Sequence, residues 1–283
     1  MKYSAVLSFF KRPENKPGRD LCRVFSPLEF PKAILFDIYD TLVASTIGDL
    51  NAQLEKKRGT KSFVKTAKHY GFEEKLGQQW QKLFFRYIEE EHERCRKLGI
   101  LRAEVLVDVI WRRILDETLP ADRSIEIDER EIGLFREMCA NPVALFDGVE
   151  DLFLFLKERN ILIGIVSNAQ YYTEVVLQWL LGRSLFDFVD RNLAIFSYKL
   201  GFAKPDPHFF RYAEVAVRLM GLAPKNVWVV GNDPINDMAS SRPYGFATVL
   251  FAGKGSIEEV AGSDIDAIVG SFGNLLDLVK GLE

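Results

Sequence analysis

Short runs of consecutive apolar residues recur along the chain and are separated by longer amphipathic segments. Runs of this length, rich in Ile, Val, Leu and Phe and bounded by Gly, Pro or polar residues, are typical of buried strands. They are residues 33–38, 161–167, 193–197, 226–231, 246–252 and 266–270. Segments between them, such as DLFLFLKERN at 151–160, carry apolar residues at helical spacing. This alternation predicts an α/β domain whose parallel sheet is covered by helices on both faces.

The stretch from residue 45 to residue 141 has a different pattern, with helical spacing and almost no strand signal. One hydrophobic stripe consists of Trp80, Leu83, Phe84, Tyr87 and Ile88, and a second consists of Val105, Val109, Ile110, Ile114 and Leu115. Residues 1–31 carry four prolines among scattered charges. We therefore expect an irregular lead-in at 1–31, an α/β core built from 32–44 and 142–283, and a helical insertion at 45–141.

Composition and charge narrow the class of partner. The 37 Lys and Arg residues against 40 Asp and Glu give a net charge of −3, so no overall basic field attracts nucleic acid. No apolar run approaches the roughly 18 residues that a transmembrane helix needs. The three cysteines are far apart and form neither a CxxC pair nor a metal-ligand cluster. These features favour a small-molecule substrate, with no nucleic-acid or membrane partner, in the cytoplasm. They leave the oligomeric state open.

Polar residues with useful chemistry follow several of the predicted strands. They are Asp37, Ser167 with Asn168, Lys204, and Asp233 with Asp237. In open α/β sheets the ligand binds outside the carboxyl ends of the strands, so we expect these side chains to share one site.

The chemistry of these residue types is mutually consistent. A carboxylate such as Asp37 can be a covalent nucleophile, as in aspartyl-phosphate enzymes. Together with Asp233 and Asp237 it offers three hard oxygen ligands, which suit Mg²⁺. Lys204 would neutralise part of the charge of the crowded carboxylates and of an incoming anion. The hydroxyl of Ser167 can hold phosphate oxygens.

The four motifs, taken in order, resemble those of the haloacid dehalogenase-like (HAD) hydrolase superfamily. DIYDTLV at 37–43 resembles the first motif, SN at 167–168 the second, Lys204 in AKPDP the third, and GNDPIND at 231–237 the acidic fourth. The resemblance covers residues 32 to about 252. It implies a Rossmann-like α/β core, with the insertion at 45–141 acting as the helical cap of one major branch. The set of motifs is specific for the superfamily and leaves the substrate open.

The resemblance also implies roles for individual residues. Asp37 would be the nucleophile, and Lys204 would steady it. Thr41 and Ser167, together with Asn168, would contact the transferred group of the substrate.

The resemblance further implies a magnesium site. Mg²⁺ would lie between Asp37, the backbone carbonyl of Tyr39, and the acidic residues Asp233 and Asp237. The fourth motif can be aligned with either Asn232 or Asp233 at its first acidic position, and only Asp233 carries a charge.

Tyr39 departs from the pattern of the family's phosphatases, which usually read DxDxT. In those enzymes the second Asp protonates the leaving alkoxide and then deprotonates the attacking water. Asp40 comes one residue later, and a one-residue shift in an extended segment points the side chain the other way. A phenol of pKa about 10 is a poor general base, and that contribution is typically worth about 10²–10⁴ in rate. Tyr39 also matches the DxYGT motif of the 2-haloacid dehalogenase branch, where a halide leaves without protonation.

The favoured interpretation is a Mg²⁺-dependent phosphatase that acts on a small phosphorylated metabolite through an aspartyl-phosphate at Asp37. One alternative is a 2-haloacid dehalogenase-type hydrolase that uses the same nucleophile. The enzymes of that branch work without a metal and carry SSNxxD in the fourth motif, whereas Asp233 and Asp237 favour a cation. A second alternative is a catalytically weak binding or interaction protein on the same fold, since fold alone does not determine function.

Overall fold

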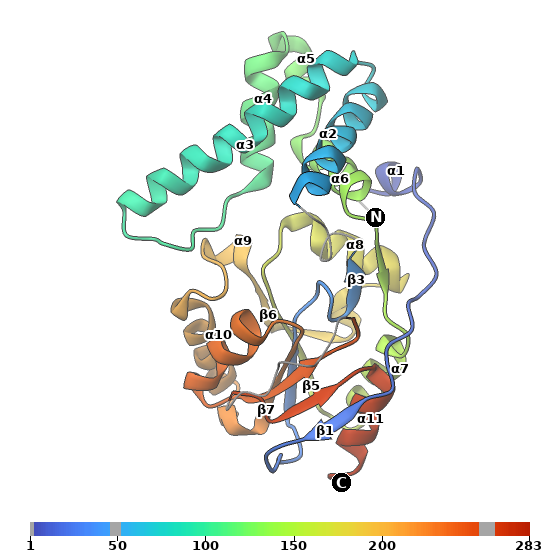
Figure 1. The fold of residues 1–283 in the computed structure, drawn as a ribbon, viewed down its shortest axis with the longest axis vertical. Coiled ribbons are helices and arrows are strands. Elements are labelled where there is room, and N and C mark those ends of the chain that lie inside the picture. The colour runs from blue at the N-terminus through green and yellow to red at the C-terminus, as the bar shows by residue number, and fades with distance from the viewer. Residues whose placement is uncertain (1–2, 46–51, 255–263) are drawn as a thin grey trace. The chain divides into compact units, whose positions relative to one another are not determined.

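The computed structural model describes residues 3–45, 52–254 and 264–283 and divides the chain into two compact units (Figure 1). The first unit comprises Met1–Pro13, Ser45–Val143 and Gln170–Trp179. The second comprises Glu14–Ala44, Ala144–Ala169 and Leu180–Glu283.

A seven-stranded sheet forms the centre of the second unit, in the order β1-β9-β8-β7-β2-β5-β6. Its strands are β1 (Cys22–Val24), β2 (Ala33–Phe36), β5 (Leu162–Ser167), β6 (Val189–Phe196), β7 (Val227–Gly231), β8 (Ala247–Phe251) and β9 (Ala267–Val269). All neighbouring strands run parallel except β1, which pairs with β9 in the antiparallel sense. The α/β prediction with a mostly parallel sheet is confirmed.

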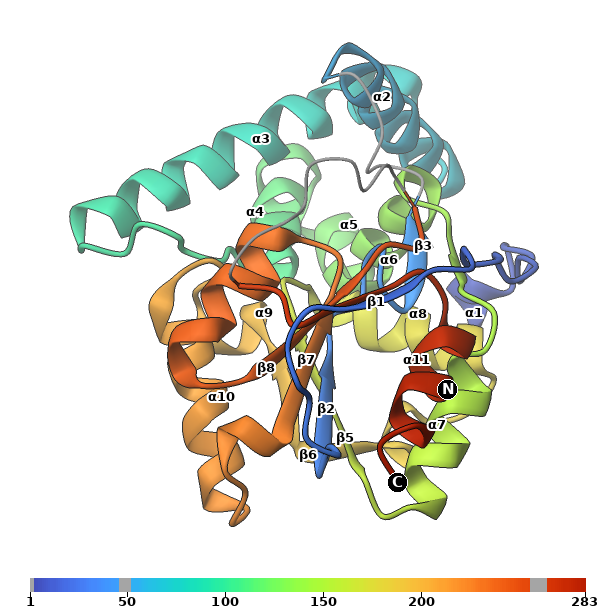
Figure 2. The same ribbon diagram turned by 60° about the horizontal axis from the view of Figure 1, so that its bottom comes forward.

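Helices cover both faces of this sheet, which explains why its central strands are apolar throughout. Every residue of β2 and β7 is buried, as expected for a parallel sheet with no solvated face. The α-helices of the second unit are α7 (Val149–Glu158), α9 (Ser197–Leu200), α10 (Pro207–Leu219) and α11 (Phe272–Lys280). It also contains the 3₁₀-helices η1 (Leu185–Asp187), η2 (Pro224–Asn226) and η4 (Arg242–Tyr244) and the π-helix η3 (Pro234–Ala239). Figure 2 shows α7 and α11 on one face and α10 on the other.

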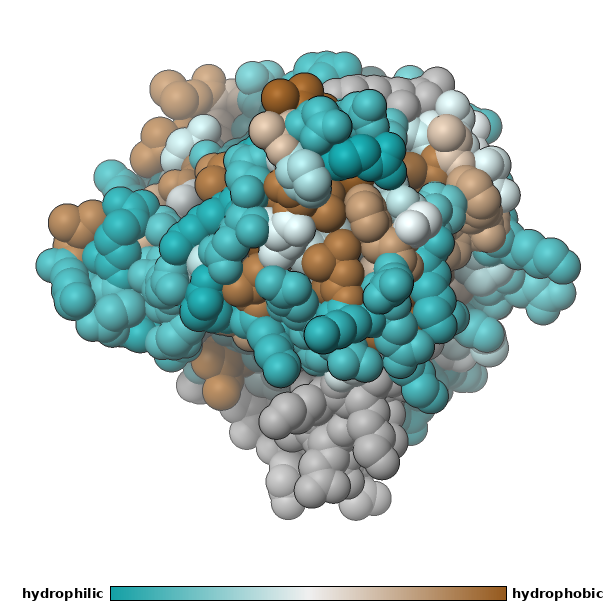
Figure 3. Space-filling model, turned by 90° about the horizontal axis from the view of Figure 1, so that it is seen from above, coloured by the Kyte–Doolittle hydropathy of each residue, from teal (hydrophilic) through white to brown (hydrophobic). Residues whose placement is uncertain are grey.

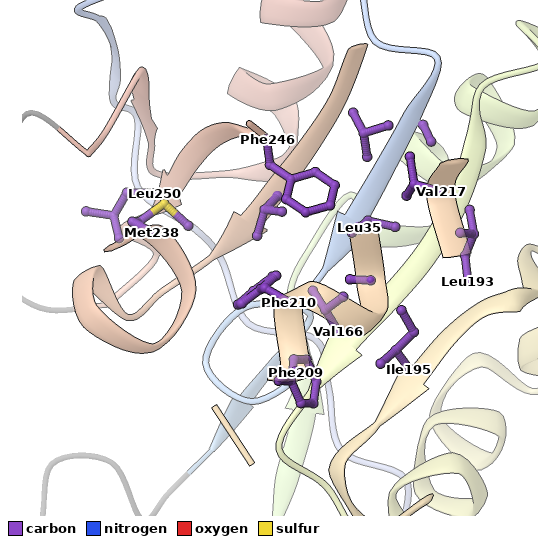
Figure 4. Close-up of a cluster of buried hydrophobic side chains, with 14 of the residues drawn as sticks. Leu35, Val166, Leu193, Ile195, Phe209, Phe210, Val217, Met238, Phe246 and Leu250 are labelled. Atoms are coloured by element: carbon purple, nitrogen blue, oxygen red, sulfur yellow. The ribbon is translucent and has the colours of Figure 1, made fainter. Parts of the chain in front are cut away.

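The α10 face of the sheet holds a cluster of buried hydrophobic side chains (Figure 4). Phe209, Phe210 and Val217 of α10 pack with Leu35 of β2 and Val166 of β5. Burying an aliphatic or aromatic side chain of this size contributes about 1.5–3 kcal/mol. The same packing holds the ends of β2 and β5, and therefore the residues that follow them, in one place.

The lead-in contains a strand that the sequence analysis did not predict. Cys22–Val24 forms β1 at the edge of the sheet, with Cys22 opposite Val269 and Val24 opposite Ala267. All three side chains of β1 are exposed, so the strand lacks the apolar pattern by which the other strands were predicted. The lead-in also contains the short helix α1 (Ser4–Leu7).

The first unit is built from helices around an aromatic core. They are α1, α2 (Ala52–His69), α3 (Glu74–Lys97), α4 (Val107–Thr118), α5 (Ala121–Glu126), α6 (Glu129–Ala140) and most of α8 (Tyr171–Leu181). Trp80 of α3 and Trp111 of α4 meet edge to face with ring centroids 5.7 Å apart. Both are fully buried, whereas Val109, which was predicted to share the second stripe, is exposed.

The segment beginning at Gln170 belongs to this helical unit, although the sequence analysis assigned it to the α/β core. The Gln170 amide nitrogen donates to the carbonyl of Val105, and its amide oxygen accepts from the Val107 backbone N–H. A helix that follows a strand of the sheet therefore packs with the insertion.

A second, two-stranded sheet is formed by β3 (Val43–Ser45) and β4 (Val143–Leu145), on either side of the insertion in sequence.

The face drawn in Figure 3 is mainly hydrophilic, with hydrophobic residues showing between the polar ones. Across the described ranges, no helix is both long and apolar enough to span a bilayer.

Candidate active site at the ends of the parallel strands

The three central strands β7, β2 and β5 end side by side, because they are parallel neighbours in register. Phe36 of β2 lies opposite Val230 of β7 and Ile165 of β5. The next residues along the chain therefore emerge together at one edge of the sheet. The Asp37 backbone N–H continues the pairing by donating to the Val230 carbonyl at 2.9 Å.

Lys204 joins two carboxylates at this edge. Its ammonium group donates to Asp37 Oδ1 at 2.8 Å, to Asp237 Oδ1 at 2.5 Å and to the carbonyl oxygen of Val166 at 2.9 Å. These partners use all three of its donors. The side chains of Lys204, Asp37 and Asp237 are 3%, 9% and 2% exposed, so two negative charges and one positive charge are buried together.

Burial and charge act in opposite directions on the protonation of this cluster. Burial disfavours the charged form of Lys204, but the carboxylates of Asp237 and Asp37 outweigh it and raise the pKa of Lys204 above its usual range. Burial raises the pKa of Asp237 to about 6; the Lys204 ammonium opposes this rise, and the Asp37 carboxylate adds to it. The cluster holds two carboxylates and one ammonium group, so its electrostatics favour the binding of a further positive charge.

Asp233 caps the short helix η3. Its Oδ1 accepts hydrogen bonds from the backbone N–H groups of Ile235 and Asn236 at 2.8 and 2.9 Å, and its Oδ2 accepts from the Asn236 side-chain amide at 2.6 Å. The Asp233 backbone N–H in turn donates to Asp237 Oδ2 at 3.0 Å. The acidic motif thus folds into a compact turn in which the two carboxylates have separate partners.

Asn232 and Thr41 approach each other beside this turn. The Thr41 hydroxyl, which is fully buried, donates to the Asn232 amide oxygen at 3.4 Å. Asn232 and Asp233 both line the same hollow, so the lining includes both residues that the fourth motif could place at its first acidic position.

The serine and asparagine at the end of β5 have different surroundings. Asn168 holds the backbone of Lys204, since its Oδ1 accepts from the Lys204 N–H at 2.7 Å and its Nδ2 donates to the Lys204 carbonyl at 3.0 Å. The hydroxyl of Ser167 is buried and has no hydrogen-bond partner among the described residues. A buried hydroxyl in this state is costly unless a ligand or water satisfies it.

Tyr39 and Asp40 lie in the turn that follows Asp37. Asp40 adopts the left-handed backbone conformation, with φ of 58°, which side-chain-bearing residues seldom adopt. Its carboxylate pairs with Lys254 at 3.0 Å. Tyr39 contributes to the hollow and Asp40 does not.

The predicted site residues largely gather around one small hollow of about 140 Å³. Its lining consists of Asp37, Tyr39, Asn168, Lys204, Asn232, Asp233, Asn236 and Asp237. Of the predicted residues, Thr41 and Ser167 are buried beside these strand ends without lining it. Asn236 was not predicted; its position three residues after Asp233, at the start of a helix, was the available signal.

The lining supplies oxygen ligands but few unengaged carboxylates. Within residues 3–45, 52–254 and 264–283, no group of three or more His, Cys, Asp or Glu side chains is placed to hold a metal ion. The assignment of Asp37, Asp233 and Asp237 as joint metal ligands therefore stays a prediction.

Comparison with known proteins identifies the family. The model of the haloacid dehalogenase-like hydrolase family matches residues 31–243. An uncharacterized hydrolase of Schizosaccharomyces pombe is 24% identical over 223 residues, which is 75% of this chain and 86% of that protein. The human haloacid dehalogenase-like hydrolase domain-containing protein 3 is 28% identical over 141 residues, which is 49% of this chain and 53% of the human protein.

Solved structures agree on the fold. The 2-haloacid dehalogenase of Pseudomonas syringae matches with a TM-score of 0.58 at 19% identity, over 89% of this chain and 98% of that one. The HAD phosphatase of Thermococcus onnurineus matches with a TM-score of 0.52 at 18% identity, over 88% and 98%. The fold and the match to the family model define a hydrolase with a Rossmann-like α/β core. The chain belongs to the haloacid dehalogenase-like hydrolases, as the sequence motifs predicted.

Proposed function

We propose that the protein hydrolyses a small phosphorylated molecule through a covalent aspartyl-phosphate on Asp37. The observation that supports this most is the buried cluster in which Lys204 holds Asp37 and Asp237 at the edge of a polar hollow. A carboxylate that a cation holds in one orientation is positioned to attack a bound substrate. A carboxylate paired at the surface lacks this fixed orientation.

Lys204 has two roles in this proposal. It orients Asp37 through a 2.8 Å hydrogen bond and offsets the repulsion that an anionic substrate would meet from Asp37 and Asp237. Asn168 keeps Lys204 in place through its two backbone hydrogen bonds. Ser167 is buried beside the hollow, and its hydroxyl, which has no partner within the described ranges, would bind a substrate oxygen in this proposal.

The chemistry of the lining fits Mg²⁺, which prefers oxygen ligands and retains several waters. The carboxylate of Asp37, the backbone carbonyl of Tyr39 and a side-chain oxygen of Asn232 or Asp233 would hold it, with Asp237 beside them. When bound, the cation would neutralise charge on the transferring phosphoryl group. Asp37 and Lys204 keep the roles described above.

A dehalogenase-type hydrolysis of a 2-haloacid is the second candidate, and Tyr39 is the observation that favours it. A halide leaves as a stable anion, so a site without a carboxylic acid at position 39 has no deficit in that reaction. The oxygen-rich lining around Asp233 favours the phosphatase.

Phosphate release from a panel of small phosphate esters, with Mg²⁺ and with chelator, tests the proposal. Native protein should release phosphate in a Mg²⁺-dependent manner, and Asp37→Asn should abolish the release. Asp277→Asn, at an exposed position in the C-terminal helix, is the matched control and should retain it. Halide release from 2-haloacids without phosphate release would replace the proposal with the second candidate.

A further inference from the structure

We infer that the site is selective for acyl phosphates over alkyl phosphate monoesters, because none of the described carboxyl groups that line the hollow is placed to protonate a leaving oxygen. This inference rests on the proposed function and concerns the substrate class of the same site. It follows from the hydrogen bonds of each carboxylate in the hollow and from the identity of the remaining side chains.

Each carboxylate that lines the hollow already has another task. Asp37 is the nucleophile and is bound by Lys204. Asp237 accepts from Lys204 through one oxygen and from the Asp233 backbone N–H through the other. Asp233 accepts from the first N–H groups of η3 and from Asn236. None of the three is placed as a separate proton donor to a leaving group.

The other candidates for an acid are excluded by position or by chemistry. Asp40 pairs with Lys254 and does not line the hollow. The described lining includes no histidine; its remaining members are Tyr39 and the amides Asn168, Asn232 and Asn236, with Lys204 already bound by two carboxylates. Tyr39 lines the hollow and brings a phenol, which is a much weaker acid than a carboxyl group.

How much rate is lost without a carboxylic acid depends on the leaving group of the substrate. An alkyl phosphate must expel an alkoxide, whose conjugate acid is about as weak an acid as water. An acyl phosphate expels a carboxylate, whose conjugate acid has a pKa of about 4. General acid catalysis is typically worth about 10²–10⁴ in rate, and only the alkoxide needs it.

The first step is balanced without any proton. A carboxylate oxygen of Asp37 forms a bond to phosphorus as the bond from phosphorus to the acyl oxygen breaks, and that electron pair leaves with the carboxylate product. In the second step, water forms a bond to phosphorus and the bond from phosphorus to Asp37 breaks. One water proton stays on the released phosphate and the other passes to solvent, which regenerates the Asp37 carboxylate.

Among the described residues of the lining, no carboxylate is left without another task to activate the water in the second step. We therefore expect the aspartyl-phosphate to break down slowly, so that acyl phosphates give a burst of one carboxylate product per protein molecule before steady turnover. The burst separates formation of the intermediate from its hydrolysis.

A matched pair of substrates tests the inference: acetyl phosphate and ethyl phosphate carry the same number of carbon atoms. We would measure kcat/KM for both, corrected for uncatalysed hydrolysis, and extend the series with aryl phosphates of graded leaving-group pKa. The native protein should show a steep decline of kcat/KM with leaving-group pKa. Tyr39→Asp should make this decline shallower by raising kcat/KM for ethyl phosphate about 10²–10⁴-fold. Tyr39→Asn, in which the new side chain is the uncharged isostere of Asp, should leave the decline steep.

The possible outcomes separate this inference from the proposed function. Equal kcat/KM for acetyl and ethyl phosphate in the native protein would overturn the inference and leave the aspartyl-phosphate mechanism standing. No phosphate release from any member of the series beyond that of Asp37→Asn would overturn both. If Tyr39→Asp fails to fold, the leaving-group series and the burst in the native protein still decide the question.

Discussion

Replacing Lys204 by methionine should destabilise the α/β unit strongly, because it leaves two carboxylates buried without their shared cation. At an effective dielectric constant of about 20, the attractions across the observed 2.8 and 2.5 Å separations are worth about 6 and about 7 kcal/mol before desolvation is counted. Breaking a buried ion pair by removing one partner typically costs about 3–5 kcal/mol. We expect Lys204→Met to lose about that much free energy of unfolding at pH 7.

The loss should be smaller at pH 5 than at pH 7. Burial holds the pKa of Asp237 at about 6, above its usual value, so this carboxyl favours the folded state below the unfolded-state pKa. That contribution is lost as the pH rises through the folded-state value. Removing Lys204 takes away a charge that lowers the pKa of Asp237. The variant should therefore lose more free energy of unfolding at pH 7, where Asp237 must ionise, than at pH 5.

The assay is urea unfolding in the presence of chelator, followed by far-UV circular dichroism at both pH values. Lys225→Met is the matched control, since Lys225 pairs with Glu29 at the exposed surface and such pairs contribute about 0–1 kcal/mol. The double variant Lys204→Met with Asp237→Asn should lose less than the sum of the single variants. Equal losses for Lys204→Met and Lys225→Met, or strict additivity in the double variant, would refute the reasoning.

Further measurements test the surrounding structure. Asp233→Ala should lower the free energy of unfolding by about 0.5–2 kcal/mol, because it removes the cap of η3; an unchanged urea midpoint would contradict this. Phe210→Ala should cost about 3–5 kcal/mol in the same assay, because Phe210 is fully buried in the α10 cluster. Mg²⁺ at about 100 times its dissociation constant should stabilise the native protein by about 2.7 kcal/mol. Asp37→Asn should show no such gain in a thermal melt if Asp37 is a ligand. Asp266→Asn should cost about 1–3 kcal/mol at neutral pH, because a buried acceptor is lost to Arg242 and Thr248. Although burial opposes it, these hydrogen bonds lower the pKa of Asp266, so the difference should disappear as the pH falls through that lowered value.

The strands of the sheet could be predicted because burial on both faces leaves an unambiguous record in the residues. Ala33–Phe36 and Val227–Gly231 are apolar at every position, and each was predicted within two residues of its observed ends. Cys22–Val24 could not be predicted in this way, because an exposed edge strand is held by backbone pairing rather than by apolar burial. The packing of Gln170 with the helical unit could not be predicted for a related reason, since it depends on side-chain hydrogen bonds to residues about 65 positions earlier.

The candidate site was predicted in part. The carboxyl-end rule for parallel strands brought Asp37, Lys204 and Asp237 to one edge, and the structure joins them through hydrogen bonds. The rule says nothing of how each carboxylate is used. That Asp233 caps a helix depends on the local turn of η3, and that Asp40 turns towards Lys254 depends on a left-handed backbone. Neither follows from residue type or spacing.

The sequence distance between Asp37 and Lys204 has a consequence for synthesis. The two residues are 167 positions apart, and β2 cannot pair with its neighbours β5 and β7 until both have been synthesised. At ordinary translation rates of about 5–20 residues per second, roughly 10–30 s pass between the synthesis of Asp37 and that of Lys204. Throughout that interval Asp37 is an ordinary carboxylate on a growing chain, and its buried pairing with Lys204 arises only when the late part of the polypeptide folds against the early part.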